Sequence, residues 1–196
     1  MDRTDAELLS GAASGDAQAY SIFFRRHVQA VTTYAIRRCA TPEDVSDLVG
    51  DCFLVALQAA ERYRPETETA LPWLFGISRR LVSRQRRRNA SRSRLLTKAS
   101  NVFPRFTESE EEAVAAALDA ARQAPALEEA LRRLSKSERE VLELVAYDGL
   151  TPSEAAYSLG ITPNAARLRL SRARRSVRDS LETDGILIEV EAKYAI

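Results

Sequence analysis

The sequence predicts an all-α protein of two small helical domains joined by a flexible linker, the C-terminal domain being a helix-turn-helix. Apolar residues recur at helical spacing in almost every segment, and helix-start signals precede them. The stretch 91–125 interrupts this pattern with serines and a proline. We therefore expect an N-terminal domain over residues 1–95, a linker over 96–125, a C-terminal domain over 126–183 and a tail over 184–196.

Four helices are predicted in the N-terminal domain. The third shows the start signal most fully, because Thr41 supplies a capping hydroxyl, Pro42 occupies the first helical position, and Glu43 and Asp44 place acids in the first turn. The other three are expected to begin at Thr4 or Asp5, at Asp16 and at about Leu71. The serines at 91 and 93 are expected to interrupt the fourth.

The C-terminal domain begins with a short amphipathic helix, LEEALRRL, and continues with three start signals. Ser135 with Glu138, and Thr151 with Glu154, form capping-box patterns. Thr162-Pro163 begins a last helix that is expected to reach about residue 181. A short helix, a tight turn with glycine and a longer helix predict a helix-turn-helix.

Composition argues against conventional enzyme chemistry. The chain has one histidine, His27, two cysteines, Cys39 and Cys52, and no Gly-rich phosphate loop, so we expect no catalytic site, metal site or cofactor. His27 is expected at the surface, Cys52 in the core, and Cys39 beside arginines that could lower its thiol pKa. No apolar run approaches the roughly 20 residues that span a bilayer, so we expect no membrane insertion and a cytoplasmic protein.

Positive charge is concentrated in two places. Residues 61–98 hold 11 arginines and lysines against three acids. The last helix holds six arginines between Pro163 and Leu181, with Asp179 as the acid near its end. Two basic surfaces in one small protein favour a polyanionic partner.

The last helix separates into two faces. Ala166, Leu170, Ala173, Val177 and Leu181 fall within about 40° of one line at 100° per residue and predict a narrow buried stripe. Arginines and polar residues occupy the opposite side. A helix of this kind can enter the major groove of DNA, with its N-terminal residues at base edges and later arginines at phosphates.

Two segments resemble the bacterial sigma-70 family, in particular its extracytoplasmic-function (ECF) type. The segment LRRLSKSEREVLELVAYDGLTPSEAAYSLGITPNAARLRLSRARRSV resembles the family's C-terminal domain. VSDLVGDCFLVAL resembles its core-polymerase-binding helix, and ALPWLFGISRRLVSRQRRR the helix beside its promoter-melting loop. The resemblance covers about residues 5–95 and 126–182, with both domains in the family's order.

The resemblance implies that the chain is a sigma factor that directs core RNA polymerase to promoter DNA, initiates transcription and is controlled by an anti-sigma factor. The −35 element would then be read by residues of the last helix: Asn164, Arg167, Leu168, Arg169, Ser171, Arg172 and Arg175. The single strand of the −10 element would be held by an arginine-rich set: Arg62, Tyr63, Arg64, Arg79, Arg80, Arg84, Arg86 and Arg87. Core polymerase would bind Asp47, Val49, Gly50 and Asp51.

At four positions the sequence differs from the residues that are usual in the family. Gly50 stands where glutamine is usual, inside a helix where glycine is destabilising by roughly 1 kcal/mol relative to alanine. Arg80 and Arg84 replace the common Asn and Asp, and Ala165 replaces a common threonine. Trp73 and Phe75 are conceivable platforms for bases, although Trp73 lies among apolar positions typical of a core.

Two other functions stay open on sequence grounds. A stand-alone helix-turn-helix regulator would share the C-terminal domain but would need a receiver or ligand domain, and residues 5–95 show no parallel-sheet pattern. A helical adaptor would leave both basic helices unexplained. The tail, residues 184–196, alternates partly like a strand, and we expect it to be frayed, with packing on the C-terminal domain or strand addition to a partner as alternatives.

Overall fold

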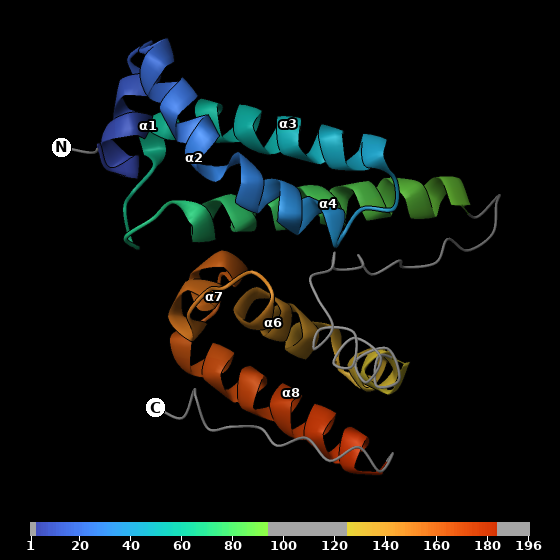
Figure 1. The fold of residues 1–196 in the computed structure, drawn as a ribbon. Coiled ribbons are helices and arrows are strands. Elements are labelled where there is room, and N and C mark those ends of the chain that lie inside the picture. The colour runs from blue at the N-terminus through green and yellow to red at the C-terminus, as the bar shows by residue number, and fades with distance from the viewer. Residues whose placement is uncertain (1–2, 94–124, 184–196) are drawn as a thin grey trace, which may run out of the picture. The chain divides into compact units, whose positions relative to one another are not determined.

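The structure is a computed structural model that describes residues 3–93 and 125–183. Every regular element within those two ranges is a helix, as the sequence predicts (Figure 1). The chain divides into two compact units, one described before residue 94 and the other after residue 124. The expected linker up to residue 124 and the expected tail lie outside the described residues.

The first unit contains four α-helices and one short 3₁₀ helix. These are α1 (Asp5–Ala13), α2 (Ala17–Ile36), α3 (Pro42–Gln58), η1 (Ala60–Arg62) and α4 (Leu71–Ser93). Helix α4 continues through Ser91–Ser93, so the expected interruption there is wrong. Serine lowers helix propensity by only a fraction of a kcal/mol, which the neighbouring arginines, good helix formers, can offset.

The predicted caps lie where the sequence places them. Thr4 caps α1: its Oγ1 accepts from the backbone N of Glu7 at 3.3 Å, and the Glu7 carboxylate accepts from the Thr4 N at 2.7 Å. Of the two residues expected to cap this helix, Thr4 is therefore the cap. The Asp5 carboxylate is left for another role. Thr41 caps α3 through a single bond, in which its Oγ1 accepts from the Asp44 N at 3.1 Å.

The core of the first unit lies where α1, α2, α3 and α4 converge. Phe23 of α2 packs edge-on against Phe53 of α3, with ring centroids 6.3 Å apart. Tyr34 of α2 stacks on Phe75 of α4 at 4.9 Å. The Tyr20 hydroxyl donates to the Phe53 carbonyl oxygen at 2.9 Å and adds a polar tie between α2 and α3. Aromatic pairs of this kind contribute about 0.5–1.5 kcal/mol beyond burial.

The second unit begins with a helix whose described part covers residues 125–133. It continues with α6 (Lys136–Ala146), α7 (Pro152–Leu159) and α8 (Pro163–Thr183). Its buried cluster joins Leu131 and Leu134 to Ala173 of α8, with Leu142 and Val177 packed around them. No helix in the described ranges is both long and apolar enough to cross a bilayer.

Glycine ends α7 for a conformational reason. Gly160 has φ of +66°, a backbone conformation that side chains with a Cβ rarely adopt. The Ile161 N then donates to the Ala156 carbonyl at 3.0 Å, a bond that satisfies one of the last carbonyls of α7. This turn reverses the chain into α8 and completes the helix-turn-helix.

Candidate nucleic-acid interface

Helix α8 is anchored at its start by the turn that precedes it. Thr162 Oγ1 accepts from the Ala165 N at 3.2 Å, and Pro163 occupies the first helical position. These two features fix where the helix begins. The side chains of its first two turns are therefore presented in a defined register.

The buried stripe of α8 is the predicted one. Ala166, Leu170, Ala173 and Leu181 are each at most 4% exposed, and Val177 is half-buried against the cluster of Leu131 and Leu134. The predicted DNA-contacting side lies opposite: Asn164, Arg167, Leu168, Ser171, Arg172 and Arg175 are exposed, and Arg169 is half-buried. Helical periodicity alone thus placed the side of this helix that faces solvent.

The exposed side of α8 carries uncompensated positive charge. Within residues 125–183 the structure pairs none of its six arginines with a carboxylate. By contrast, Arg132 and Arg133 outside α8 both pair with Glu129, at 2.7 and 3.2 Å. Leu168 lies among the arginines of α8 and is 49% exposed. Such a surface can contact phosphates through its arginines and base edges through its polar and apolar side chains.

Two arginines outside α8 fasten the scaffold that holds it. Arg133 donates to the Ser180 hydroxyl near the end of α8 at 3.3 Å. Arg139 of α6 donates to the Leu131 carbonyl at the end of the preceding helix. These arginines are structural, which separates them from the six on α8.

Helix α4 carries the second basic surface. Its apolar side packs into the core through Leu74 and Ile77, whereas Arg80, Arg84, Arg86 and Arg87 are exposed and Arg79 is half-buried. Arg86 donates to the Arg38 carbonyl at 3.4 Å, and Arg87 to the Ser83 carbonyl at 3.2 Å. The structure thus brings the predicted α4 arginines together along one helix.

The remaining residues predicted to hold the −10 strand lie at the end of η1 and in the loop that leads to α4, and they differ in exposure. Arg62 and Arg64 are exposed, and Arg64 donates to the Tyr63 carbonyl at 3.1 Å. Tyr63 belongs to the core and packs on Trp73 with ring centroids 4.8 Å apart, so its ring does not stand free as a platform for a base. Burial raises the pKa of Tyr63 to about 12. Phe75 is only 2% exposed and is likewise no free platform.

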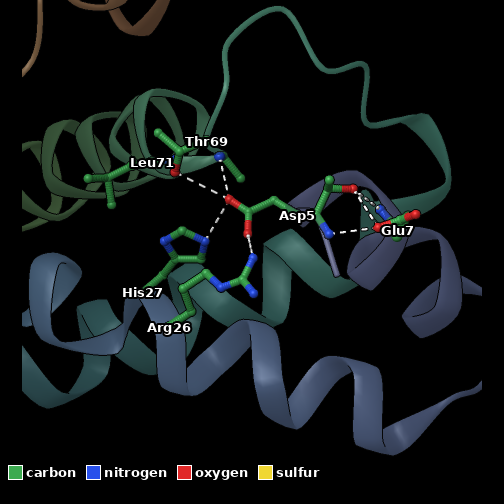
Figure 2. Close-up of polar contacts among 8 residues, drawn as sticks. Asp5, Glu7, Arg26, His27, Thr69 and Leu71 are labelled. Carbon is green, nitrogen blue, oxygen red and sulfur yellow. Dashed lines mark hydrogen bonds and ion pairs between the residues drawn. The ribbon is translucent and has the colours of Figure 1, made fainter. Parts of the chain in front are cut away.

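A buried polar cluster at the other end of this loop was missed by sequence reasoning. The Asp5 carboxylate, 5% exposed, accepts from His27, from Arg26 and from the loop residues Thr69 and Ala70 (Figure 2). The prediction that His27 lies at the surface is wrong, because its ring is also only 5% exposed. A signal was available: His27 falls in the stripe Ala19, Phe23, Val31 and Ala35, at intervals of four residues along α2.

The charge of Asp5 is stabilised where it lies. Burial acts to raise the pKa of Asp5, but hydrogen bonds from His27, Ala70 and Arg26 and the attraction of His27 outweigh it and hold that pKa well below its usual range. A carboxylate only accepts hydrogen bonds, so the His27 Nε2 must carry the hydrogen in the 2.9 Å contact with Asp5 Oδ2.

Helix α3 presents the predicted polymerase-binding residues. Asp47, Gly50 and Asp51 are exposed, and Val49 is half-buried against the core. Leu54, which sequence reasoning missed, is 52% exposed three residues after Asp51 and so shares their side. Leu57, three residues further along α3, is 36% exposed. The result is a helix face that combines two acids with apolar side chains.

The cysteines are not activated thiols. Burial and the charge of Asp44 raise the pKa of Cys39 to about 11. Arg86 and Arg38 act to lower this pKa, as expected of neighbouring arginines, but they are outweighed. Cys52 is fully buried, as predicted, and burial raises its pKa to about 11. Among the described residues no cluster of His, Cys, Asp and Glu could hold a metal ion.

Comparison with known proteins matches both units to one family. Residues 23–92 match Sigma-70 region 2, and residues 125–177 match Sigma-70 region 4. The chain is 33% identical to the RNA polymerase sigma factor CnrH of Cupriavidus metallidurans over 94% of this chain and 98% of CnrH. It is 28% identical to the ECF RNA polymerase sigma factor SigL of Mycobacterium tuberculosis, over 91% of this chain and 97% of SigL.

Solved structures agree with these relatives. CnrH in complex with the cytosolic domain of CnrY superposes with a TM-score of 0.62 at 29% identity, over 93% of this chain and 99% of that one. RpoE in complex with the anti-sigma factor NepR from Bartonella quintana shares the fold, with a TM-score of 0.61 at 20% identity over 86% and 99%. Residues 23–92 match Sigma-70 region 2 and not a receiver domain. The chain therefore belongs to the sigma-70 family, as an RNA polymerase sigma factor of the ECF type.

Proposed function

We propose that this sigma factor places core RNA polymerase at a promoter by inserting α8 into the major groove at the −35 element. The observation that carries this proposal is the division of α8 into a buried apolar stripe and an exposed side with five of its six arginines, none of the six being paired with a carboxylate within residues 125–183. Asn164, Arg167 and Leu168 lie in the first turns, where a groove-bound helix meets base edges. Arg172 and Arg175 lie further along, within reach of bases or phosphates.

The first unit would hold the melted non-template strand of the −10 element. Binding of a single strand needs a positive surface that follows the phosphates, together with contacts to the bases. Arg80, Arg84, Arg86 and Arg87 of α4 supply such a surface. Arg62 at the end of η1 and Arg64 in the following loop are exposed and add positive charge, and the buried Tyr63 ring anchors the loop in the core.

Core polymerase would bind the exposed face of α3. Asp47 and Asp51 offer negative charge, and Leu54 offers a half-exposed apolar anchor between turns. Acids that surround an apolar contact suit a basic partner surface with an apolar pocket. Because CnrH is solved with the cytosolic domain of CnrY, we also propose that an anti-sigma factor controls this chain, in the cytoplasm where polymerase and promoters are found.

The experiment is run-off transcription with core polymerase on genomic promoters, comparing the wild type with Arg172→Ala. A lost base contact weakens promoter binding by about 1–3 kcal/mol and relaxes preference at one base pair, whereas a lost phosphate contact weakens all sequences alike. Arg132→Ala is the matched control, because it removes the same charge from an exposed residue of the second unit outside α8. Equal initiation by both variants across a promoter panel would refute the assignment of α8.

A further inference from the structure

The Asp5 cluster joins three segments that are distant in the sequence. Asp5 Oδ1 accepts from Arg26 of α2 at 2.7 Å. Asp5 Oδ2 accepts from His27 Nε2 at 2.9 Å, from Thr69 Oγ1 at 3.2 Å and from the Ala70 N at 2.7 Å. Figure 2 shows His27 and Arg26 directed at the carboxylate from α2, with the loop segment on its other side.

The two loop contacts occur where α4 begins. Ala70 immediately precedes α4, and its carbonyl accepts the first helical bond, from the Leu74 N at 3.0 Å. The Leu71 N donates to Thr69 Oγ1 at 3.2 Å, so the same threonine caps α4 and binds Asp5. A carboxylate at a helix N-terminus is also favoured by the helix dipole.

The loop thus has a fixed attachment at each end and an exposed middle. At its start Tyr63 packs on Trp73, and at its end Thr69 and Ala70 are held by Asp5. Between them Arg64, Pro65, Glu66 and Glu68 are exposed, and Thr67 Oγ1 donates to the Thr69 carbonyl at 2.7 Å. The conformation of these exposed residues therefore depends on both attachments.

We infer that Asp5 and His27 are positioning residues for recognition of the −10 single strand: through Thr69 and Ala70 they fix the loop 64–69 in the shape that receives DNA. The inference rests on the proposed function of the first unit. His27 contributes by holding the carboxylate, since its Nε2–H shares Asp5 Oδ2 with both loop donors. Neither residue needs to touch DNA, because both are buried.

A purely stabilising role would predict something different. A loop that has lost its attachment must be ordered again when DNA binds, which weakens binding of the single strand but not of the −35 duplex. A variant that is only less stable, and is assayed well below its unfolding temperature, would bind both the single strand and the −35 duplex as the wild type does. The ratio between the two affinities therefore separates positioning from stabilisation.

The test measures holoenzyme binding to two probes made from a promoter that wild-type holoenzyme transcribes: a fork DNA with the −10 non-template strand single-stranded, and the −35 duplex alone. Asp5→Ala should lower the fork affinity about tenfold, which corresponds to re-ordering about one loop residue, and leave the −35 duplex affinity unchanged. Val31→Ala is the control, because Val31 is fully buried on α2 and takes no part in the cluster.

A second pair of variants covers the case in which Asp5→Ala fails to fold. His27→Gln can place an amide N–H near the position of Nε2 and should retain fork binding, whereas His27→Leu removes the donor and should behave like Asp5→Ala. Equal fork-to-duplex ratios for Asp5→Ala and Val31→Ala, or for His27→Leu and His27→Gln, would overturn the inference alone. Wild-type holoenzyme that gains no affinity from the single strand would overturn the proposed function of the first unit as well.

Discussion

Replacing Gly50 by alanine should stabilise the first unit, and the structure indicates by how much. Gly50 lies inside α3, is exposed, and a Cβ built on it meets nothing within 4 Å. Its backbone is helical rather than left-handed, so an alanine fits without strain. The expected gain is the difference in helix propensity, about 0.8–1 kcal/mol.

That free energy converts into a measurable shift of the melting temperature. A domain of about 90 residues has an unfolding entropy of roughly 0.19 kcal/mol/K, from about 2.1 cal/mol/K per residue. Gly50→Ala should therefore raise the melting temperature of the first unit by about 4–5 °C. The protein's single tryptophan, Trp73, lies in this unit, so its fluorescence in the full chain follows this transition.

Gly15→Ala is the matched control for this reasoning. Gly15 also has nothing within 4 Å of a built Cβ, but its φ is +92°, where a side chain is strained. The same substitution should therefore destabilise the unit by about 1–2 kcal/mol. A neutral or destabilising Gly50→Ala, or a stabilising Gly15→Ala, would refute the argument that backbone conformation decides the sign.

Three further predictions concern the interfaces and titratable groups. Asp51→Lys should weaken core-polymerase binding in a pull-down without lowering the melting temperature, because Asp51 is exposed on α3; unchanged binding would remove this face from the polymerase interface. The depressed pKa of Asp5 means that its contribution to stability is complete above about pH 4 and declines as the pH falls, because the unfolded chain then takes up a proton that the folded chain does not. The stability difference between wild type and Asp5→Ala should accordingly shrink from pH 6 to pH 3 in denaturant titrations, and a constant difference would contradict it. Cys39 and Cys52, each with a thiol pKa of about 11, should react with iodoacetamide at pH 8 far more slowly in the native protein than in urea, and equal rates would contradict their burial.

Local signals were sufficient to predict where most of the α-helices begin. A capping residue, a proline at the first helical position or a glycine at the end acts within a few residues of itself, so Thr41-Pro42 and Thr162-Pro163 could be interpreted without knowing the fold. The same holds for α8, whose buried stripe follows from 3.6-residue periodicity alone. The exposed arginines of α4 and α8 were predictable for the same reason.

Contacts between distant segments were not predictable in this way. Asp5 lies 65 residues before Ala70 and 22 before His27, and no local pattern indicates that these three meet. An aromatic residue in a basic loop, such as Tyr63, suits either base stacking or the core, and the sequence does not contain the packing on Trp73 that buries its ring. The net pKa shift of Cys39 was not predictable because the opposing effects of burial, Asp44 and the nearby arginines depend on distances that the sequence does not contain.

The buried charge of Asp5 is likewise explained by contacts between segments that are distant in the sequence. An isolated buried carboxylate is strongly destabilising, and this one is tolerated because four donors from α2 and the loop converge on its two oxygens. Leaving those donors unpaired would itself be destabilising, since a buried donor without a partner loses about 1–3 kcal/mol. The contacts are therefore mutually dependent: α1 places the acceptor, Arg26 and His27 of α2 hold it, and the loop adopts a conformation in which Thr69 and Ala70 donate to it. A polar cluster of this kind specifies a loop conformation more sharply than apolar packing, because a displaced hydrogen bond is lost within a fraction of an ångström.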